Sequence, residues 1–157
     1  MNRKFFSSEE GMDPCHEVQV IKKYMDENLI HGSLRMFLDI HAHSVKKGIF
    51  AYAPVPESNY GSARTKCFSL ILDDMSEVFS IDNCRYNNDR QKKNCARLGI
   101  FNQYELDDSY TIESSCYGFE SKTVEGTKTI QFTVRHFIEF GKSLSLAIAR
   151  HLFVASP

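Results

Sequence analysis

The chain has 157 residues, of which 42% are hydrophobic, 25% charged and 12% aromatic, and its mean hydropathy is -0.35. This length and composition are typical of one globular domain and exclude a disordered, fibrous or multidomain protein. With 19 basic and 20 acidic residues the net charge is -1, which gives no general electrostatic footprint for nucleic acid or for an anionic membrane.

The cysteines and the apolar segments bear on the cellular compartment. The amino-terminal residues MNRKFFSSEEGM contain no apolar core of the kind a signal peptide needs, and no stretch approaches the roughly 20 apolar residues of a spanning helix. Five scattered cysteines without a CxxC pair argue against a disulfide framework and against a cysteine-rich zinc site. We therefore expect a soluble, cytoplasmic protein with reduced thiols.

In the first half of the chain, periodic apolar residues predict two helices and two strands. A helical spacing of apolar residues predicts a helix over about 16–29. The short apolar runs 34–40 and 49–53 predict strands, with His-Ala-His-Ser at the tip between them. A second helix is predicted over about 63–79, and the polar residues 82–94 are expected to form a loop.

In the second half, residues 97–101 and 109–113 are each predicted to form a strand, and residues 131–152 a long amphipathic helix. No repeat or linker divides the chain, so we expect one domain over residues 1–157. Strands that alternate with helices predict a three-layer α/β architecture.

His41 is the first candidate for chemistry. The sequence Asp39-Ile40-His41-Ala42-His43-Ser44 comes at the end of a strand expected to be buried, where open α/β sheets commonly place their sites. A neutral imidazole binds Zn²⁺ well when a carboxylate or a carbonyl holds its other ring N–H. From spacing alone, a packed or surface histidine is the more common explanation.

Glu113 is the second candidate, at the end of the strand SYTIE. A carboxylate that follows an apolar strand loses part of its hydration, which raises its pKa toward the range that serves proton transfer. Without other support, a solvated glutamate at a strand end is the more common explanation.

Several segments together resemble the cytosolic carboxypeptidases, a branch of the M14 zinc metallocarboxypeptidases that trims glutamates from tubulin tails. The most specific segments are LRMFLDIHAHSVKKGIFAYA and SYTIESSCYGF, and ARLGIF, EGTKTIQF and FIEFGKSLSLAIARHL extend the resemblance over nearly the whole chain. The resemblance implies a three-layer mixed-sheet fold of the zinc-carboxypeptidase kind.

The resemblance also implies roles for individual residues. His41 matches a zinc ligand and Glu113 matches the general base and acid. Asn2 and Arg3 match the pair that binds the terminal carboxylate of the substrate, a task that suits a bidentate guanidinium. Arg97 is the best candidate for recognising a glutamate side chain. A solvated surface charge is at least as good an explanation for each of the lysines, namely Lys46, Lys47, Lys92 and Lys93. Tyr104 is only a candidate for a substrate-capping tyrosine.

The chain departs from the family pattern at its amino-terminal side. The HxxE pair that supplies two zinc ligands would lie upstream of Asn2, as would a further substrate-binding arginine and an amino-terminal β domain. The sequence therefore resembles the carboxyl-terminal part of a catalytic domain. One HxxE spacing, His136 to Glu139, falls in the last predicted helix, and we interpret it as a coincidence.

Two hypotheses about function remain open. The first is a zinc carboxypeptidase that releases carboxyl-terminal glutamate from protein tails, with one of its three zinc ligands in this chain. The second is a non-catalytic module, or an inactive fragment, that binds such tails without hydrolysis. An incomplete sheet would leave an unpaired strand edge, so we also expect poor solubility or dimerisation.

Overall fold

The computed structural model describes residues 16–29, 34–89 and 94–154. Its elements are α1 (His16–Leu29), β1 (Phe37–His43), β2 (Ile49–Ala53), α2 (Asn59–Met75), η2 (Ile81–Asn83), β3 (Arg85–Tyr86), α3 (Ala96–Tyr104), β4 (Ser109–Ser115), β5 (Phe119–Thr123), β6 (Gly126–Ile130) and α4 (Val134–Val154). Among these described helices, none is both long and apolar enough to cross a membrane. Asn2, Arg3, Lys92 and Lys93 lie outside the described residues.

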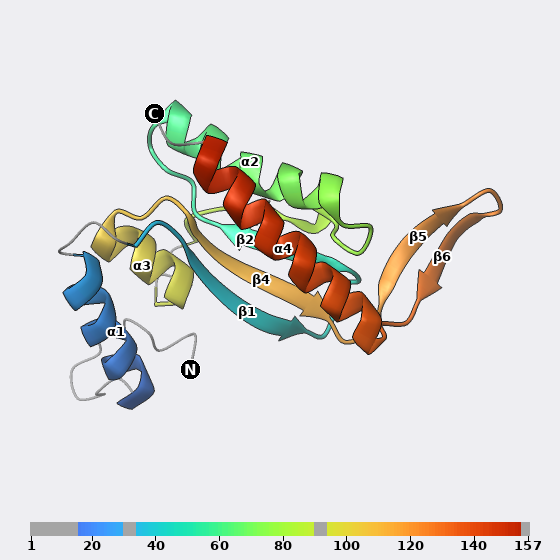
Figure 1. Ribbon diagram of the computed structural model, residues 1–157, viewed down its shortest axis with the longest axis horizontal. Helices are drawn as coiled ribbons and strands as arrows, with labels where there is room; N and C mark the ends of the chain where they lie inside the picture. Colours follow the sequence, from blue (N-terminus) through green and yellow to red (C-terminus); the bar gives the residue numbers. More distant parts are fainter. Residues whose placement is uncertain (1–15, 30–33, 90–93, 155–157) are drawn as a thin grey trace.

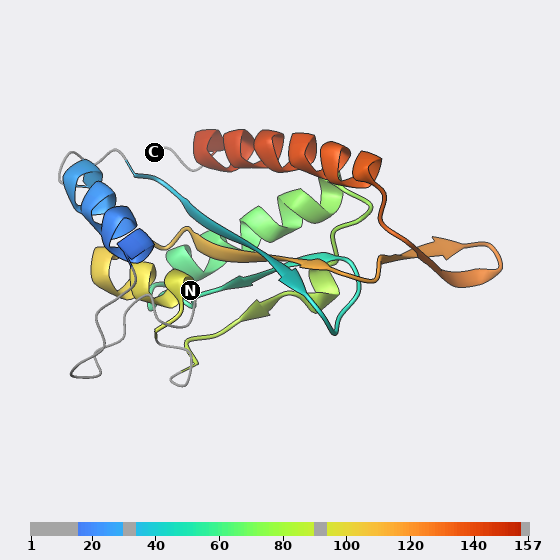
Figure 2. The ribbon, with the colours of Figure 1, turned by 90° about the horizontal axis from the view of Figure 1, so that it is seen from below.

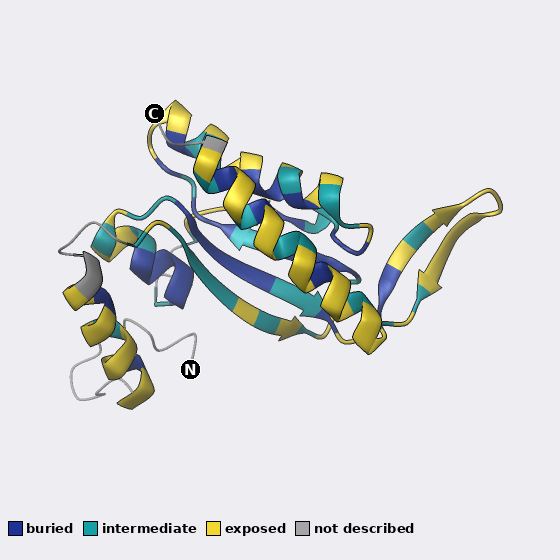
Figure 3. Cartoon of the chain, viewed as in Figure 1, coloured by how far each residue is buried: buried dark blue, intermediate teal, exposed yellow. Residues whose placement is uncertain are grey.

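A mixed sheet of four strands, in the order β1-β4-β2-β3, forms the centre of the molecule. β1 runs parallel to β4, β2 runs antiparallel to β4, and β3 runs parallel to β2. β4 and β2 each lie between two neighbours and are mostly buried, whereas the residues of β1 at the sheet edge are only partly buried or exposed (Figure 3). The prediction of a buried β1 is wrong, because among the described residues a strand pairs with only one of its two edges.

Helices α2 and α4 cover one face of the sheet (Figures 1 and 2). Phe68 of α2 packs against Tyr110 of β4 with ring centroids 4.7 Å apart, and Ala147 of α4 is fully buried in the same cluster. Side chains alternate along a strand, so the neighbours of Tyr110 point to the opposite face, where the Ser109 hydroxyl donates to the Arg97 carbonyl of α3. The prediction of a layered α/β fold with a mixed sheet is confirmed.

α3 differs from its prediction as a strand over 97–101. Residues 96–100 are all buried, so the run shows neither the alternation of a half-buried strand nor the stripe of an amphipathic helix. Ala96 and Ile100 pack with Val18 and Met25 of α1 in a second, smaller core cluster. The short apolar run thus forms a helix that packs between α1 and the sheet.

The other elements agree with the sequence to different degrees. The predicted bounds of α1 and β2 match those observed. α2 begins four residues earlier than predicted, because the Ser58 hydroxyl accepts a hydrogen bond from the Gly61 amide and caps the helix. β1 continues to His43, so His41 and His43 belong to the strand and not to the tip of a turn.

The hairpin β5–β6 was not predicted and extends away from the sheet (Figures 1 and 2). It begins beside Gly118, whose φ of +119° is a left-handed conformation that favours glycine. A Cβ atom on Gly118 would lie 2.1 Å from the Ile130 carbonyl oxygen, so the base of the hairpin closes only with glycine at this position.

Candidate functional site

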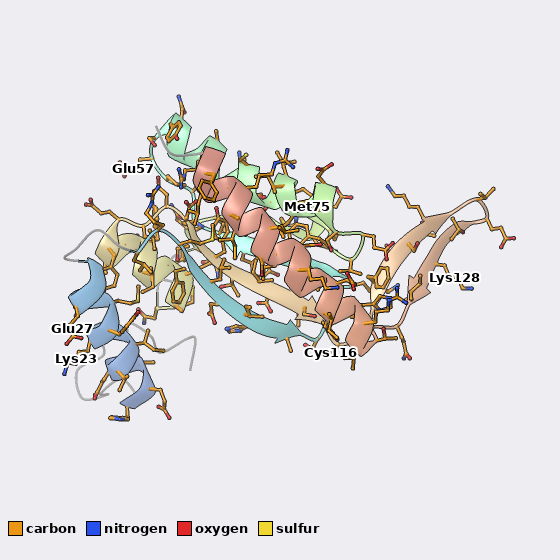
Figure 4. All side chains as sticks on the ribbon, viewed as in Figure 1. Lys23, Glu27, Glu57, Met75, Cys116 and Lys128 are labelled. Atoms are coloured by element: carbon orange, nitrogen blue, oxygen red, sulfur yellow. The ribbon has the colours of Figure 1, made fainter. Side chains whose placement is uncertain are left out.

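The strands β1 and β4 bring His41 and Glu113 side by side. The two residues are register partners in the parallel pair, so their side chains leave the sheet on the same face. This is the face opposite to α2 and α4. The backbone amide of Cys116, labelled in Figure 4, donates to the His43 carbonyl at 3.0 Å and joins the carboxyl ends of the two strands.

His41 is held by a carboxylate two residues earlier on the same strand. Its Nε2 lies 2.7 Å from Oδ1 of Asp39, and the side chains of His41 and Asp39 are 28% and 19% exposed. A carboxylate only accepts hydrogen bonds, so in the neutral imidazole Nε2 carries the hydrogen and Nδ1 keeps its lone pair. This arrangement is the one that metal-binding histidines commonly have.

Glu113 lies in a half-buried position among charged groups. Burial raises the pKa of the Glu113 carboxyl above its ordinary value, while the nearby His41 and His43 oppose that shift. Asp39 raises the same pKa and Arg97 lowers it. A carboxylate with a raised pKa is suited to accepting a proton and returning it.

His43 has a structural task in the turn after β1. Its Nδ1 accepts the backbone amides of Val45 and Lys46, each at 3.1 Å. Its ring also packs edge-on against Phe50, with centroids 5.1 Å apart. Because the turn occupies Nδ1, His43 does not present that nitrogen beside His41.

Arg97 extends from α3 to the same face. It is 4% exposed, and its guanidinium lies 5.5 Å from the ring centroid of Tyr52. One of its terminal nitrogens is 3.5 Å from Oδ1 of Asn87, and its Nε is buried without a hydrogen-bond partner in the described structure. Burial and Glu113 together raise the pKa of Tyr52.

Two residues of this face were missed by the sequence analysis as parts of the site. Asp39 and Thr111 are register partners, and each has a buried oxygen without a partner among the described residues, namely Oδ2 and Oγ1. The available signal was the two-residue period of a strand, since Asp39 precedes His41 by two and Thr111 precedes Glu113 by two. Unpartnered buried polar atoms are uncommon in folded proteins.

The two lysines after β1 have different positions. The ammonium group of Lys46 donates to the Asn83 carbonyl and lies 5.0 Å from the ring centroid of Phe50, beside the site. Lys47 instead binds Glu120 and Thr129 of the hairpin, at 3.1 Å and 2.8 Å.

Tyr104 and the HxxE spacing lie elsewhere. The Tyr104 hydroxyl donates to Asp26 of α1 at 2.6 Å. On α4, Nδ1 of His136 accepts the Thr133 amide at 3.0 Å, while Glu139 pairs with Lys142 at 2.8 Å. Each group therefore has a local partner.

The residues present do not fit a complete zinc site. Within residues 16–29, 34–89 and 94–154, no group of three or more His, Cys, Asp or Glu side chains is placed to hold a metal ion. His41 offers one free imidazole nitrogen, whereas a catalytic zinc generally has three protein ligands.

The chain is similar to curated proteins over most of its length. It is 27% identical over 135 residues to Cytosolic carboxypeptidase 1 of Danio rerio, which covers 78% of this chain and 11% of that protein. It is 29% identical over 130 residues to Cytosolic carboxypeptidase 6 of Mus musculus, which covers 80% of this chain and 23% of that protein. The chain thus spans less than a quarter of the length of these relatives. No family model matches the sequence.

Solved structures share the fold. A metallo-carboxypeptidase of Burkholderia cenocepacia matches with a TM-score of 0.76 at 16% identity, over 99% of this chain and 38% of that one. A metallo-carboxypeptidase of Pseudomonas aeruginosa matches with a TM-score of 0.63 at 16% identity, over 88% of this chain and 35% of that one. The chain thus matches less than two fifths of each of these two structures.

Proposed function

We propose that this chain, which resembles the carboxyl-terminal part of a cytosolic carboxypeptidase in sequence and of metallo-carboxypeptidases in fold, serves in the release of carboxyl-terminal glutamate from protein tails such as those of tubulin. The observation that carries the proposal is the register pairing of His41 with Glu113 on one face of the sheet. The cytoplasm is the compartment that agrees with the names of the relatives.

Glu113 is proposed as the general base and then the general acid. Its carboxylate takes a proton from a water molecule while the water oxygen bonds to the scissile carbonyl carbon. When the carbon–nitrogen bond breaks, the same proton passes to the leaving nitrogen. The raised pKa of Glu113 supports this role, because a stronger base accepts the proton more readily.

Zinc is the cofactor that the resemblance implies, and His41 would bind it through Nδ1. When bound, zinc supplies a Lewis acid beside the reacting carbonyl. The remaining ligands would have to come from outside the described residues, since no three His, Cys, Asp or Glu side chains among the described residues are placed to hold a metal ion. A partner polypeptide or another part of a longer protein would meet this need.

Substrate recognition is proposed for Arg97, Asn2 and Arg3. The buried guanidinium of Arg97 has an unpartnered Nε and lies near Glu113, which supports a role in binding an acidic side chain. The proposal that Asn2 and Arg3 bind the terminal carboxylate rests on the resemblance alone, since both lie outside the described residues.

A binding module without hydrolysis is the second candidate function. It is favoured by one observation, the absence of a three-ligand metal group among the described residues. In this case the basic and polar groups around Arg97 would hold an acidic tail, and Glu113 would take no part in chemistry.

A peptidase and binding assay tests both candidates, first on the purified 157-residue chain and then on this chain together with the polypeptide that supplies the remaining zinc ligands. Zinc content is measured by elemental analysis, and free amino acid is measured after incubation with peptides that end in glutamate or in leucine. The catalytic proposal predicts release of glutamate that the variant Glu113→Gln lowers by about 10²–10⁴-fold, the range for loss of a general base. Arg97→Leu is expected to reduce the preference for glutamate over leucine.

The control is Glu77→Gln, which changes an exposed glutamate after α2 and is expected to leave release unchanged. Residual activity at the wild-type level in Glu113→Gln would remove Glu113 from its role. Binding of the glutamate peptide without zinc and without release in both preparations would establish the binding module, and the absence of binding and of cleavage in both preparations would contradict both candidates.

A further inference from the structure

Asp39 is a carboxylate of β1 that the resemblance does not assign to any role. Its Oδ1 lies 2.7 Å from Nε2 of His41. We propose that Asp39 is a positioning residue that fixes the tautomer and the ring orientation of His41. The use of Nδ1 of His41 for metal binding rests on the proposed function, whereas the positioning of the His41 ring by Asp39 does not.

The strand geometry places the two side chains together. Residues two apart on a strand share a face, so Asp39 and His41 both leave β1 on the side of Glu113. Both side chains are largely shielded from water, at 19% and 28% exposed, which strengthens a hydrogen bond between them. The contact joins neighbours on one rigid element and does not depend on a loop.

The hydrogen bond determines which nitrogen is free. An ionised carboxylate accepts only, so Nε2 of His41 must carry hydrogen. A neutral imidazole has one N–H group, and Nδ1 is therefore the atom with a lone pair. A carboxylate that holds the outer nitrogen of a ligating histidine is the common means of fixing its tautomer.

The second oxygen of Asp39 supports the same conclusion. Oδ2 is buried and has no hydrogen-bond partner among the described residues, so His41 is the described residue that orients the carboxylate. His43 shows the contrast, because two backbone amides bind its Nδ1 and fix it as part of a turn.

The experiment is nuclear magnetic resonance of the full chain with ¹⁵N-labelled histidine, without added metal, at pH 8.5, where free imidazoles are neutral. We expect the His41 ring to be a single tautomer with hydrogen on Nε2, and this proton to exchange slowly with water. Asp39→Ala is expected to speed that exchange at least about tenfold, because a hydrogen bond to a charged group is typically worth 1.5–3 kcal/mol.

Two further variants distinguish positioning from a general loss of structure. Asp39→Asn keeps an acceptor oxygen at the same place and is expected to restore part of the protection. Asp82→Ala removes an exposed carboxylate of η2 and is expected to leave the His41 signals unchanged. Global unfolding is followed in parallel by circular dichroism.

The proposal fails if His41 carries its proton on Nδ1, if Asp39→Ala leaves the exchange rate unchanged, or if Asp82→Ala alters it equally. These readouts use no metal and no substrate. A protected Nε2 proton in a chain that releases no glutamate would therefore support the role of Asp39 and contradict only the catalytic proposal.

Discussion

At the scale of single residues, Glu113 occupies a position that costs stability. Its pKa is raised chiefly by burial, so the folded chain binds a proton at this group more tightly than the unfolded chain does. Such a group favours folding at low pH, and that contribution is lost as the pH rises through the folded-state pKa. A carboxylate kept in this position therefore serves something other than stability.

Replacing Glu113 with glutamine is expected to stabilise the chain at pH 7, because the neutral amide removes the cost of burying a charge. We expect the midpoint of thermal unfolding to rise by about 1–2 °C at pH 7. The difference should vanish near pH 3.5, below the ordinary glutamate pKa of about 4.3. Glu77→Gln is the exposed control, and an equal change at both pH values would refute the argument.

The sequence could identify some of the site residues but not their surroundings. The resemblance pointed to His41 and Glu113, and their pairing across two distant strands agrees with a shared site. The contact between Asp39 and His41 was missed because the strand prediction ended before His41, and only a strand through both residues places them on one face. The turn that binds His43 depends on backbone geometry that residue types do not reveal.

At the scale of elements, one buried cluster joins β4 to the two covering helices. Oδ2 of Asp108 accepts two hydrogen bonds from Arg64 of α2, and Oδ1 is 2.9 Å from Nε2 of His151 on α4. Burial alone would raise the pKa of Asp108, but the hydrogen bonds from His151 and Arg64 outweigh it and hold the pKa below its ordinary value. The Tyr110 hydroxyl is a third donor, at 3.1 Å.

Removing this carboxylate is expected to destabilise the chain strongly. Asp108→Ala leaves Arg64 and His151 without their buried partner, a change that typically costs about 3–5 kcal/mol. The lowered pKa means that the stability contributed by Asp108 is full above pH 4 and falls as the pH drops through the folded-state pKa. The measurement is the free energy of unfolding in urea at pH 7, 5 and 3.

The gap between wild type and Asp108→Ala should therefore be the same at pH 7 and pH 5 and smaller at pH 3. The exposed-site variant Asp82→Ala is the control and is expected to change stability by less than about 0.5 kcal/mol. A gap that stays constant down to pH 3 would show that the cluster does not depend on the charge of Asp108.

Helices and strands whose apolar residues recur with a clear period could be predicted from the sequence. A helix that is buried on all sides, and a helix start that depends on a capping residue, were predicted less well. α1 has one apolar stripe and β2 a short apolar run, so both were located within their observed bounds. α3 is buried on all sides over residues 96–100, so its apolar residues show neither the helical nor the strand period. The hairpin was missed because most of its residues are exposed, so it lacks the alternation that marks a half-buried strand.

At the scale of the whole molecule, the sheet has one face covered by α2 and α4 and another that α3 covers only in part (Figure 2). The groups around Glu113 lie on this second face. The order of the strands could not be predicted from the sequence, because β4 lies between β1 and β2 although about sixty residues separate it from them. This position of β4 makes the sheet mixed and places Glu113 next to His41.

The same topology leaves β1 at the edge of the sheet. Within the described residues no strand pairs with its outer edge, and Ile40 at its centre is 65% exposed. An exposed apolar edge strand is a template for pairing with another chain. We therefore expect the isolated chain to self-associate, with an average mass that increases with concentration.

Ile40→Lys is expected to suppress this association, because a lysine on an edge strand opposes the approach of a second strand. Size-exclusion chromatography with light scattering, over a hundredfold range of concentration, measures the effect. Leu70→Lys provides the matched control, since Leu70 is 58% exposed on α2, away from the edge. Self-association that Leu70→Lys relieves as well as Ile40→Lys would assign the contact to general surface hydrophobicity, and a wild-type monomer at all concentrations would show that the edge of β1 is protected.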